Sequence, residues 1–366
     1  MNAVENINAL IAGTGYERIG LFDHFWAETL TNWSESGKYP STKRADGERS
    51  PGDAYSHFEH DMRVVWGVID HLPHLGYSEI LEESDDWIVE RNGAGAALKQ
   101  WKSRTGTPEH VDFIMTSREI WERDYRSHLL DYNEDRLLRE EAIEGLIIGK
   151  DQWTFYGDLF VWEIMRQSMG DFCMYESLLL DQPWIHDFNR VYTDFYKTHY
   201  GRILSDLPKP DGIWIYEDLG YRNGLFCSID LIRELLMPYY VEIVEFFHSY
   251  DLPVILHSCG GIEEAIPMMI EAGFDGLNPM EVKAGNDLSR IAEKYGDELI
   301  FVGGLDVRIM ETGDRDLIRR ETIGLIDAMK ERNARFVFGS DHSISTGVRY
   351  DDYEFMLEVY RQHMRY

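Results

Sequence analysis

The chain has 366 residues, of which 44% are hydrophobic and 13% aromatic, so it is long enough to bury a large core. It carries 36 Lys and Arg against 66 Asp and Glu, for a formal net charge of −30. This charge repels nucleic-acid phosphates and anionic membrane surfaces, so we expect neither as a partner. The length permits one large α/β barrel or two medium domains.

Only three cysteines occur, Cys173, Cys227 and Cys259, which are too few and too scattered for a disulfide framework. A reducing compartment is therefore the simplest expectation. The first 15 residues show no basic segment followed by an apolar one, and no apolar run approaches the roughly 18 residues of a membrane-spanning helix. We therefore predict a cytoplasmic protein.

The first 130 residues are polar and rich in Trp and acidic residues. Their patterns predict a strand at 19–22, a helix over 54–72 and a hairpin from Trp87 to Trp101 with its turn at Asn92-Gly93-Ala94-Gly95. We expect this part to be an irregular, helical N-terminal extension. Its Trp and acidic content indicates a lid or a partner surface over the mouth of the main domain.

From about residue 145, short apolar runs alternate with longer amphipathic segments, which is typical of parallel βα units. The predicted strands are 145–149, 212–216, 253–257, 274–278, 299–303 and 335–339. The predicted helices between them include 229–250, 262–272 and 316–332. With 19–22 and one strand concealed in the first third, the strands number the eight of a (β/α)₈ barrel. We predict one α/β domain over residues 1–366, a TIM barrel, with an open doubly wound sheet as the alternative.

Polar side chains follow each of the later predicted strands. In chain order they are Glu217 and Asp218, His257 and Cys259, Asn278 and Glu281, Asp306, and Asp341 and His342. In TIM barrels the active site lies at the C-terminal ends of the strands. We therefore predict Glu217, Asp218, Asn278 and Asp306 as catalytic groups. Glu163 is either a further buried carboxylate or an ordinary surface residue of a helix.

Three of these residues are of the types that bind zinc. His257 and Cys259 lie two residues apart at one strand exit, and His342 lies at another. Three protein ligands leave the fourth tetrahedral position open, as in catalytic zinc sites, and a neighbouring carboxylate could fill that position or orient an imidazole. We predict a zinc site of His257, Cys259 and His342. The alternative is an ordinary strand exit in which the imidazole and the thiol are simply packed.

Six short motifs between Tyr216 and Arg361 occur in a distinctive order. They are Tyr216-Glu217-Asp218-Leu219-Gly220, Pro238-Tyr239, Leu256-His257-Ser258-Cys259-Gly260-Gly261, Gly276-Leu277-Asn278-Pro279, Phe301-Val302-Gly303-Gly304-Leu305-Asp306 and Asp341-His342-Ser343-Ile344. In order and spacing they resemble the uroporphyrinogen decarboxylase superfamily, and the resemblance extends more faintly over the rest of the chain. It implies a TIM barrel with its site at the strand C-termini.

Within that superfamily the chain resembles the zinc-dependent methylcobamide:thiol methyltransferases of the coenzyme M type. That resemblance implies a zinc that activates an acceptor thiol, with His257 and Cys259 matching the family's His-x-Cys pair and His342 standing where a second cysteine would be. It implies methyl transfer between a methylated corrinoid and a small acceptor. No Asp-x-His-x-x-Gly corrinoid-binding pattern occurs, so a separate corrinoid protein is the expected partner. A homodimer would also agree with the family.

Two other functions remain open. One is metal-free decarboxylation of a carboxylated substrate through Asp218 or Asp306. Uroporphyrinogen decarboxylases carry an arginine-rich segment near the N-terminus, but the matching stretch here, 21–26, has no arginine, and the acidic chain disfavours an anionic tetrapyrrole. The other is a non-enzymatic corrinoid or tetrapyrrole carrier in which His257 or His342 is an axial ligand. We predict methyl transfer first and decarboxylation second.

Overall fold

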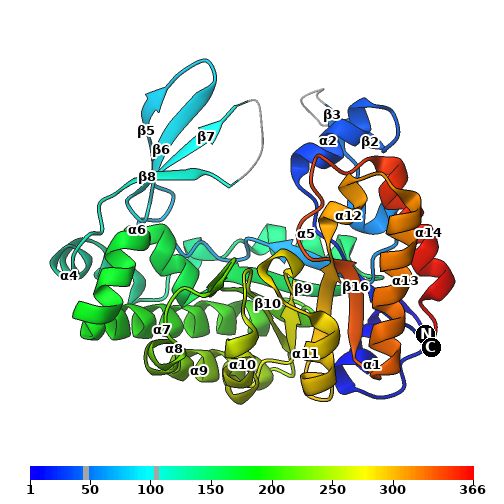
Figure 1. Cartoon of the computed structure of the whole chain (residues 1–366). Helices are drawn as coiled ribbons and strands as arrows, with labels where there is room; N and C mark the ends of the chain where they lie inside the picture. Colours follow the sequence, from blue (N-terminus) through cyan, green and yellow to red (C-terminus); the bar gives the residue numbers. More distant parts are fainter. Residues whose placement is uncertain (44–48, 103–106) are drawn as a thin grey trace.

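The computed structural model describes residues 1–43, 49–102 and 107–366. Its centre is an eight-stranded sheet in the order β1-β16-β15-β14-β13-β10-β9-β4, with parallel pairing between all neighbours (Figure 1). The strands are β1 (Gly20–Leu21), β4 (Met62–Trp66), β9 (Trp153–Leu159), β10 (Gly212–Tyr216), β13 (Val254–His257), β14 (Gly276–Asn278), β15 (Ile300–Leu305) and β16 (Phe336–Ser340). The predicted (β/α)₈ barrel is confirmed.

The two end strands of this order, β1 and β4, meet through Asp61. Its backbone N–H donates to the Leu21 carbonyl at 2.9 Å, and its Oδ2 accepts from the Leu21 N–H at 2.8 Å. Asp61 also forms an ion pair with Arg18, whose side chain is largely buried. These contacts nearly close the sheet into a barrel, and the open doubly wound alternative is wrong.

Helix α1 (Ala3–Ala12) plugs the N-terminal end of the barrel. Ile7 and Leu10 are fully buried and pack in the same cluster as inward-facing residues of the strands, such as Trp153. The Trp153 indole N–H donates to Asn8 Oδ1 at 3.0 Å. The leading end of the chain therefore lies at the opposite end of the barrel from the strand exits, so the expectation that it forms part of a lid is wrong (Figure 1).

Ten helices of the described chain follow or flank the strands of the barrel from α5 onward. They are α5 (Arg139–Ile148), α6 (Val161–Leu180), α7 (Gln182–Asp206), α8 (Ile229–Leu235), α9 (Met237–His248), α10 (Ile266–Ala272), α11 (Leu288–Tyr295), α12 (Val307–Glu311), α13 (Arg315–Glu331) and α14 (Tyr350–His363). In α13 the buried residues recur at helical spacing, and the Asp314 side chain caps the first turn. This confirms the helix predicted over 316–332.

Two predicted elements are wrong. The apolar run 145–149 belongs to the end of α5, because a short apolar run can be a helix turn as well as a strand; Ile147 is 65% exposed there, and the barrel strand is β9. The helix expected over 54–72 ends early, at α3 (Ala54–His57), and β4 follows. The β-branched pair Val64-Val65 is buried on both faces of the sheet, and β4 is thus the concealed strand.

The first 130 residues are mixed in structure, which corrects the expectation of a helical extension. They contain α2 (Ala27–Glu35), a small hairpin of β2 (Ser41–Lys43) and β3 (Arg49–Pro51), and an antiparallel sheet of β5 (Ser78–Glu83), β6 (Trp87–Asn92), β7 (Ala96–Trp101) and β8 (Glu109–Phe113). The predicted hairpin from Trp87 to Trp101 is confirmed, and Asn92 Oδ1 accepts from Ala94 N–H at 3.0 Å in its turn.

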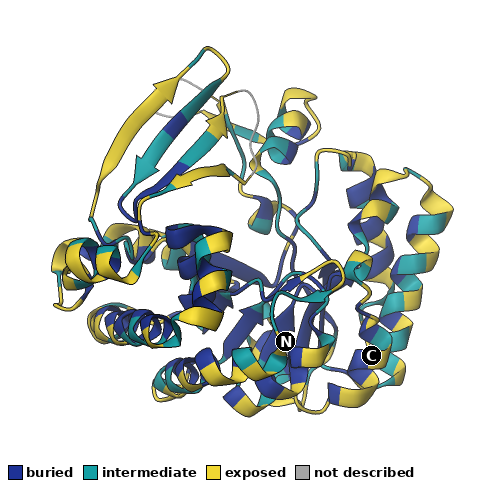
Figure 2. Ribbon diagram, turned by 60° about the vertical axis from the view of Figure 1, so that its left-hand side comes forward, coloured by how far each residue is buried: buried dark blue, intermediate teal, exposed yellow. Residues whose placement is uncertain are grey.

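The β5–β8 sheet stands above the barrel on the side of the strand exits, and its edge strand β5 is exposed along its whole length (Figures 1 and 2). Short helical turns link this sheet to the barrel: α4 (Arg118–Ile120), 121–125, 126–129 and 134–136. Within the described residues, no helix combines the length and the apolar character that crossing a bilayer requires.

Candidate active site

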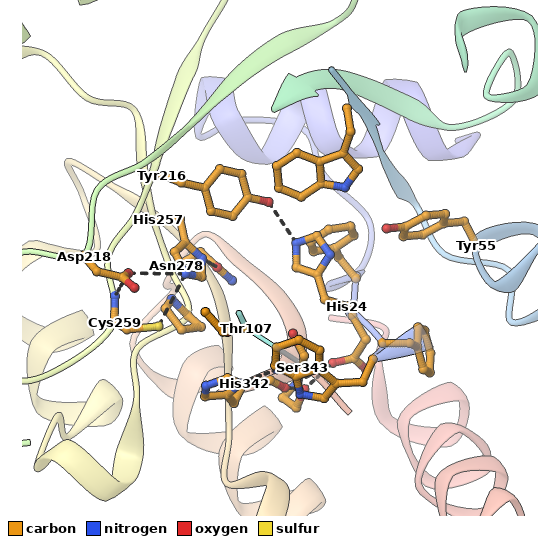
Figure 3. A pocket seen from close by; sticks show the side chains of 17 residues that line it. His24, Tyr55, Thr107, Tyr216, Asp218, His257, Cys259, Asn278, His342 and Ser343 are labelled. Atoms are coloured by element: carbon orange, nitrogen blue, oxygen red, sulfur yellow. Dashed lines mark hydrogen bonds and ion pairs between the residues drawn. The ribbon is translucent and has the colours of Figure 1, made fainter. Parts of the chain in front are cut away.

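A cavity of about 530 Å³ lies at the C-terminal ends of the barrel strands (Figure 3). The described residues that line it are Phe22, Asp23, His24, Phe25 and Trp26 after β1; Tyr55 in α3 and Trp66 at the end of β4; Thr107; Tyr216 at the end of β10 and Asp218 after it; His257 at the end of β13 and Cys259 after it; Asn278 at the end of β14 and Pro279 after it; and Ser340 at the end of β16 with His342 and Ser343 after it. Six strands thus bring side chains from distant parts of the sequence to one place, as the barrel hypothesis requires.

Three ligand-type side chains converge on one wall of this cavity. His257 Nε2 lies 3.4 Å from Cys259 Sγ and 3.6 Å from Asp218 Oδ1. One ligand atom from each of the three residues lies within 4.8 Å of the other two. Zn–N, Zn–O and Zn–S bonds of roughly 2.0–2.3 Å in tetrahedral geometry place neighbouring ligand atoms roughly 3.3–3.7 Å apart. The two closest separations already match the edges of such a tetrahedron.

Asn278 orients the His257 imidazole. Its Oδ1 lies 2.5 Å from His257 Nδ1, while its Nδ2 donates to the Val302 carbonyl at 3.0 Å. Because that second bond fixes which end of the amide is the oxygen, His257 Nδ1 is the protonated nitrogen. The lone pair of His257 is therefore on Nε2, which faces Cys259 and Asp218. This is the outer partner that metal-binding histidines commonly have, and Asn278 is a positioning residue.

The loop that carries Cys259 is held by side chains from neighbouring strand exits. Asp218 Oδ1 accepts from the Cys259 N–H at 2.8 Å, and Glu281 Oε2 accepts from the Gly260 N–H at 2.7 Å. Asn286 Nδ2 donates to the Gly260 carbonyl at 2.8 Å. The thiol is therefore placed by a rigid loop.

The electrostatics of the cluster suit a divalent cation. Burial raises the pKa of the Cys259 thiol well above its ordinary value, and the nearby carboxylates of Asp218 and Glu281 raise it further. Burial lowers the pKa of His257, which keeps the imidazole neutral and able to donate its lone pair. A dication would offset the repulsion between the thiolate and these carboxylates, and the donor set of one nitrogen, one sulfur and one oxygen fits zinc.

His342 lines the same cavity but stands apart from the cluster. Among the described residues, the group with ligand atoms within 4.8 Å of one another contains Asp218 and not His342. His342 Nδ1 accepts a hydrogen bond from the Ser343 N–H at 2.8 Å, which leaves Nε2 as its remaining ring nitrogen (Figure 3). The structure thus pairs His257 and Cys259 as predicted, and brings Asp218 to the position expected for His342.

Glu217 points away from the cavity into the protein. It is fully buried, and its carboxylate accepts from Tyr240 O–H at 2.6 Å and from Trp162 N–H at 2.9 Å in the first turn of α6. Its predicted catalytic role finds no support in this placement, which arises because side chains alternate along a strand. Trp214, Tyr216 and Asp218 share the inward face, so Glu217 must lie on the other.

Burial of Glu217 predicts a pH-dependent stability. Burial raises its pKa from 4.5 to about 8, so the folded protein retains a proton that the unfolded chain loses. The stabilising contribution is complete below pH 4.5 and is lost as the pH rises through about 8. Between pH 5 and 8 the free energy of unfolding should therefore fall by about 3–4 kcal/mol more in the wild type than in Glu217→Gln, measured by urea unfolding. If the free energies of unfolding of the two proteins changed in parallel with pH, the prediction would be contradicted. Glu293→Gln, at an exposed position, is the control and should follow the wild type.

The other acidic candidates lie off the cavity. Asp306 caps α12 and pairs with Arg308 at 2.6 Å, on a separate surface cavity of about 460 Å³ between α11 and α13. Its predicted catalytic role finds no support in this placement. Asp341 is buried and accepts from Val282 N–H at 2.8 Å and Val307 N–H at 2.9 Å, so it holds two loops. Glu163 is of intermediate burial, with its side chain 12% exposed, and it pairs with Arg166 at 2.6 Å, which favours the buried carboxylate of the two alternatives.

Sequence reasoning missed the wall opposite the cluster. Asp23, His24, Tyr55 and Trp66 all line the cavity, and Tyr216 O–H lies 3.1 Å from His24 Nε2. The signal for Asp23 and His24 was present, because they follow the predicted strand 19–22 as His257 follows its own strand. Tyr55 and Trp66 had no such signal, since β4 was concealed in a segment with a helical pattern.

Part of the chain that forms this site matches a known protein family. Residues 222–363 match the family model of uroporphyrinogen decarboxylase (URO-D). The resemblance to the URO-D superfamily is confirmed over these residues. The matched segment contains His257, Cys259, Asn278 and His342, whereas Asp218 lies four residues before it. Among curated proteins, no match to the sequence is found.

One solved structure supports the fold over the whole chain. A methyltransferase from Methanosarcina mazei superposes with a TM-score of 0.64 at 14% sequence identity, over 99% of this chain and 99% of that one. A glycosylated endo-β-1,4-xylanase from Gloeophyllum trabeum gives a TM-score of 0.39 at 10% identity, over 63% of this chain and 80% of that one. The first similarity extends over the whole chain, including the irregular N-terminal third.

Proposed function

We propose that this protein is a zinc-dependent methyltransferase that moves a methyl group between a methylated corrinoid and a small thiol or similar acceptor. The observation that carries the proposal is the convergence of His257, Cys259 and Asp218 at the wall of the barrel cavity, with Asn278 behind the imidazole. The URO-D domain and the full-length similarity to a methyltransferase support it.

Asp218, His257 and Cys259 would hold the zinc, and three protein ligands would leave a fourth position free for a substrate. Bound zinc would supply the Lewis acidity that keeps an acceptor thiol ionised near neutral pH. Residues of the chain position the ligand side chains. Asn278 fixes the tautomer of His257, and Asp218 and Glu281 hold the Cys259 loop. The aromatic rings of Tyr216 and Trp66, whose centroids are 4.7 Å apart, line the cavity beside the cluster.

In the transfer itself, the acceptor sulfur attacks the methyl carbon of the donor. An S–C bond forms while the bond between the donor and the methyl carbon breaks, and its electron pair leaves with the donor. From a methylated corrinoid, the products are a thioether and a cobalt(I) corrinoid. A separate corrinoid protein over the barrel mouth, a homodimer and a cytoplasmic location remain predictions.

Decarboxylation, the second hypothesis, takes its support from the name of the matched family. The cavity argues against it. Among the described residues that line the cavity there is no Lys or Arg, so a substrate with several carboxylates would find no cationic partner on these walls. Asp306, one of the acids assigned to that reaction, lies on another surface.

Two measurements on the same preparations test methyl transfer. Elemental analysis should find about one zinc per chain, and mixing with methylcobalamin and 2-mercaptoethanol should consume the methylcobalamin and yield the methyl thioether. Cys259→Ala should lose both the zinc and the transfer. Cys227→Ala, a thiol outside the described cavity lining, should retain both. Zinc-free wild type, or transfer by Cys259→Ala at the wild-type rate, would reject the proposal.

A further inference from the structure

Aromatic rings line the cavity around the ligand cluster. Six of the described lining residues have aromatic carbocyclic or indole rings: Phe22, Phe25, Trp26, Tyr55, Trp66 and Tyr216. The ring centroids of Trp66 and Tyr216 are 4.7 Å apart, and the His24 ring lies 6.2 Å from Trp66. Tyr216 lies beside the cluster, with its ring centroid 4.7 Å from that of His257 (Figure 3). Trp66 is 49% exposed although it lines the cavity, so much of its indole is open to a ligand at the mouth. The faces of such rings attract cations.

The charged groups on the described walls are all acidic. Asp218 belongs to the ligand cluster, where a bound metal ion would offset its negative charge. Asp23 is 2% exposed, and its hydrogen-bond donors are neutral: the Ser340 N–H and O–H, both at 2.6 Å, and the Tyr353 O–H at 2.9 Å. The neighbouring His24 adds no positive charge, because burial lowers its pKa to about 3.

We infer that this cavity admits a small cationic substrate of the quaternary ammonium class, held by the rings of Trp66 and Tyr216 and by the negative field of Asp23. Aromatic rings combined with an acidic group that lacks a cationic partner are the features that recognise such ligands in water. The net charge of −30 would also concentrate small cations at the protein surface. The role of this cation in methyl transfer rests on the proposed function, whereas its binding does not.

The test compares two probes of the same shape. Choline and 3,3-dimethyl-1-butanol differ only in the quaternary nitrogen, which is a carbon in the neutral alcohol. Titration calorimetry on the zinc-loaded, full-length protein should show choline binding at least tenfold more tightly than the alcohol. Trp66→Leu should reduce that preference to less than threefold, because the cation–π contact is lost while apolar contact is retained.

Trp101→Leu is the matched control, since Trp101 is 39% exposed on β7 and lies outside the described cavity lining. It should keep the full preference for choline. Equal binding of the two probes, no measurable choline binding, or tighter binding of anionic 2-mercaptoethanesulfonate than of choline would overturn the inference. Choline binding without methyl transfer would reject the proposed function alone, and methyl transfer without a choline preference would reject only this inference.

Discussion

Zinc affinity is expected to fall by more than about 100-fold in Asp218→Ala and by less than about 10-fold in His342→Ala. Loss of an outer-shell partner costs roughly 10–100-fold in metal affinity, and loss of a direct ligand costs more. Asp218 Oδ1 lies 3.6 Å from His257 Nε2, and Asp218 belongs to the same ligand cluster as Cys259. His342 lies outside this cluster, so it can contribute only if the loop after β16 moves.

The measurement is a competition titration against a chromogenic chelator of known affinity. Asp218→Ala also removes the acceptor for the Cys259 N–H, so Asp218→Asn is the necessary companion. The Asn variant can keep that hydrogen bond but lacks the carboxylate charge, and it should still lose most of the affinity. If His342→Ala loses zinc as completely as Cys259→Ala while Asp218→Asn keeps it, the ligand set expected from the sequence is right and the cluster in the structure is not the metal site.

Gly260→Ala is expected to destabilise the protein by about 3 kcal/mol or more and to abolish zinc binding. Gly260 has a φ of +87°, and a Cβ on it would lie 2.2 Å from the carbonyl carbon of Gly220 and 2.4 Å from the Tyr221 nitrogen. Both are backbone atoms, of the short strand β11 (Gly220–Tyr221), and cannot rotate away. The left-handed backbone costs about 1–2 kcal/mol for an L-residue, and the overpacking adds about 1–3 kcal/mol. The displaced loop is the one that carries Cys259.

Gly285→Ala separates these two contributions. Gly285 has a φ of +90°, and nothing lies within 4 Å of the position of its Cβ. Its substitution should therefore cost only the backbone term of about 1–2 kcal/mol. Urea unfolding of the two variants beside the wild type measures the difference directly. Equal losses would show that the contact between the Gly260 loop and β11 is looser than the structure indicates.

The later part of the barrel could be predicted because its signals are local. Each barrel strand from β10 to β16 is a short apolar run followed by polar residues, and α13 shows a clean helical repeat. The error at 145–149 and the missed β4 have the same physical cause. In both places the residues are apolar or β-branched over only a few positions, and the neighbours that decide between helix and strand are far away in the sequence.

The candidate site could also be predicted only in part from the sequence. The pairing of His257 with Cys259 is visible in the sequence, because the two side chains share the inward face of one strand exit. That alternation also separates Asp218, which faces the cavity, from Glu217, which is buried against α6. This alternation can be read from the sequence alone, so the opposite orientations of Glu217 and Asp218 are predictable without the structure.

The amino-acid sequence therefore contains the chemistry of the site and the class of the fold, since both depend on residues within a few positions of one another. Only the tertiary structure decides which third ligand meets the His257–Cys259 pair and which rings face it. Asp218 reaches the pair because β10 is the hydrogen-bonded neighbour of β13. Asp23, His24 and Trp66 form the other wall because the sheet curves until β1 and β4 meet through Asp61. These distances follow from the closure of a parallel barrel, a property of all eight strands together.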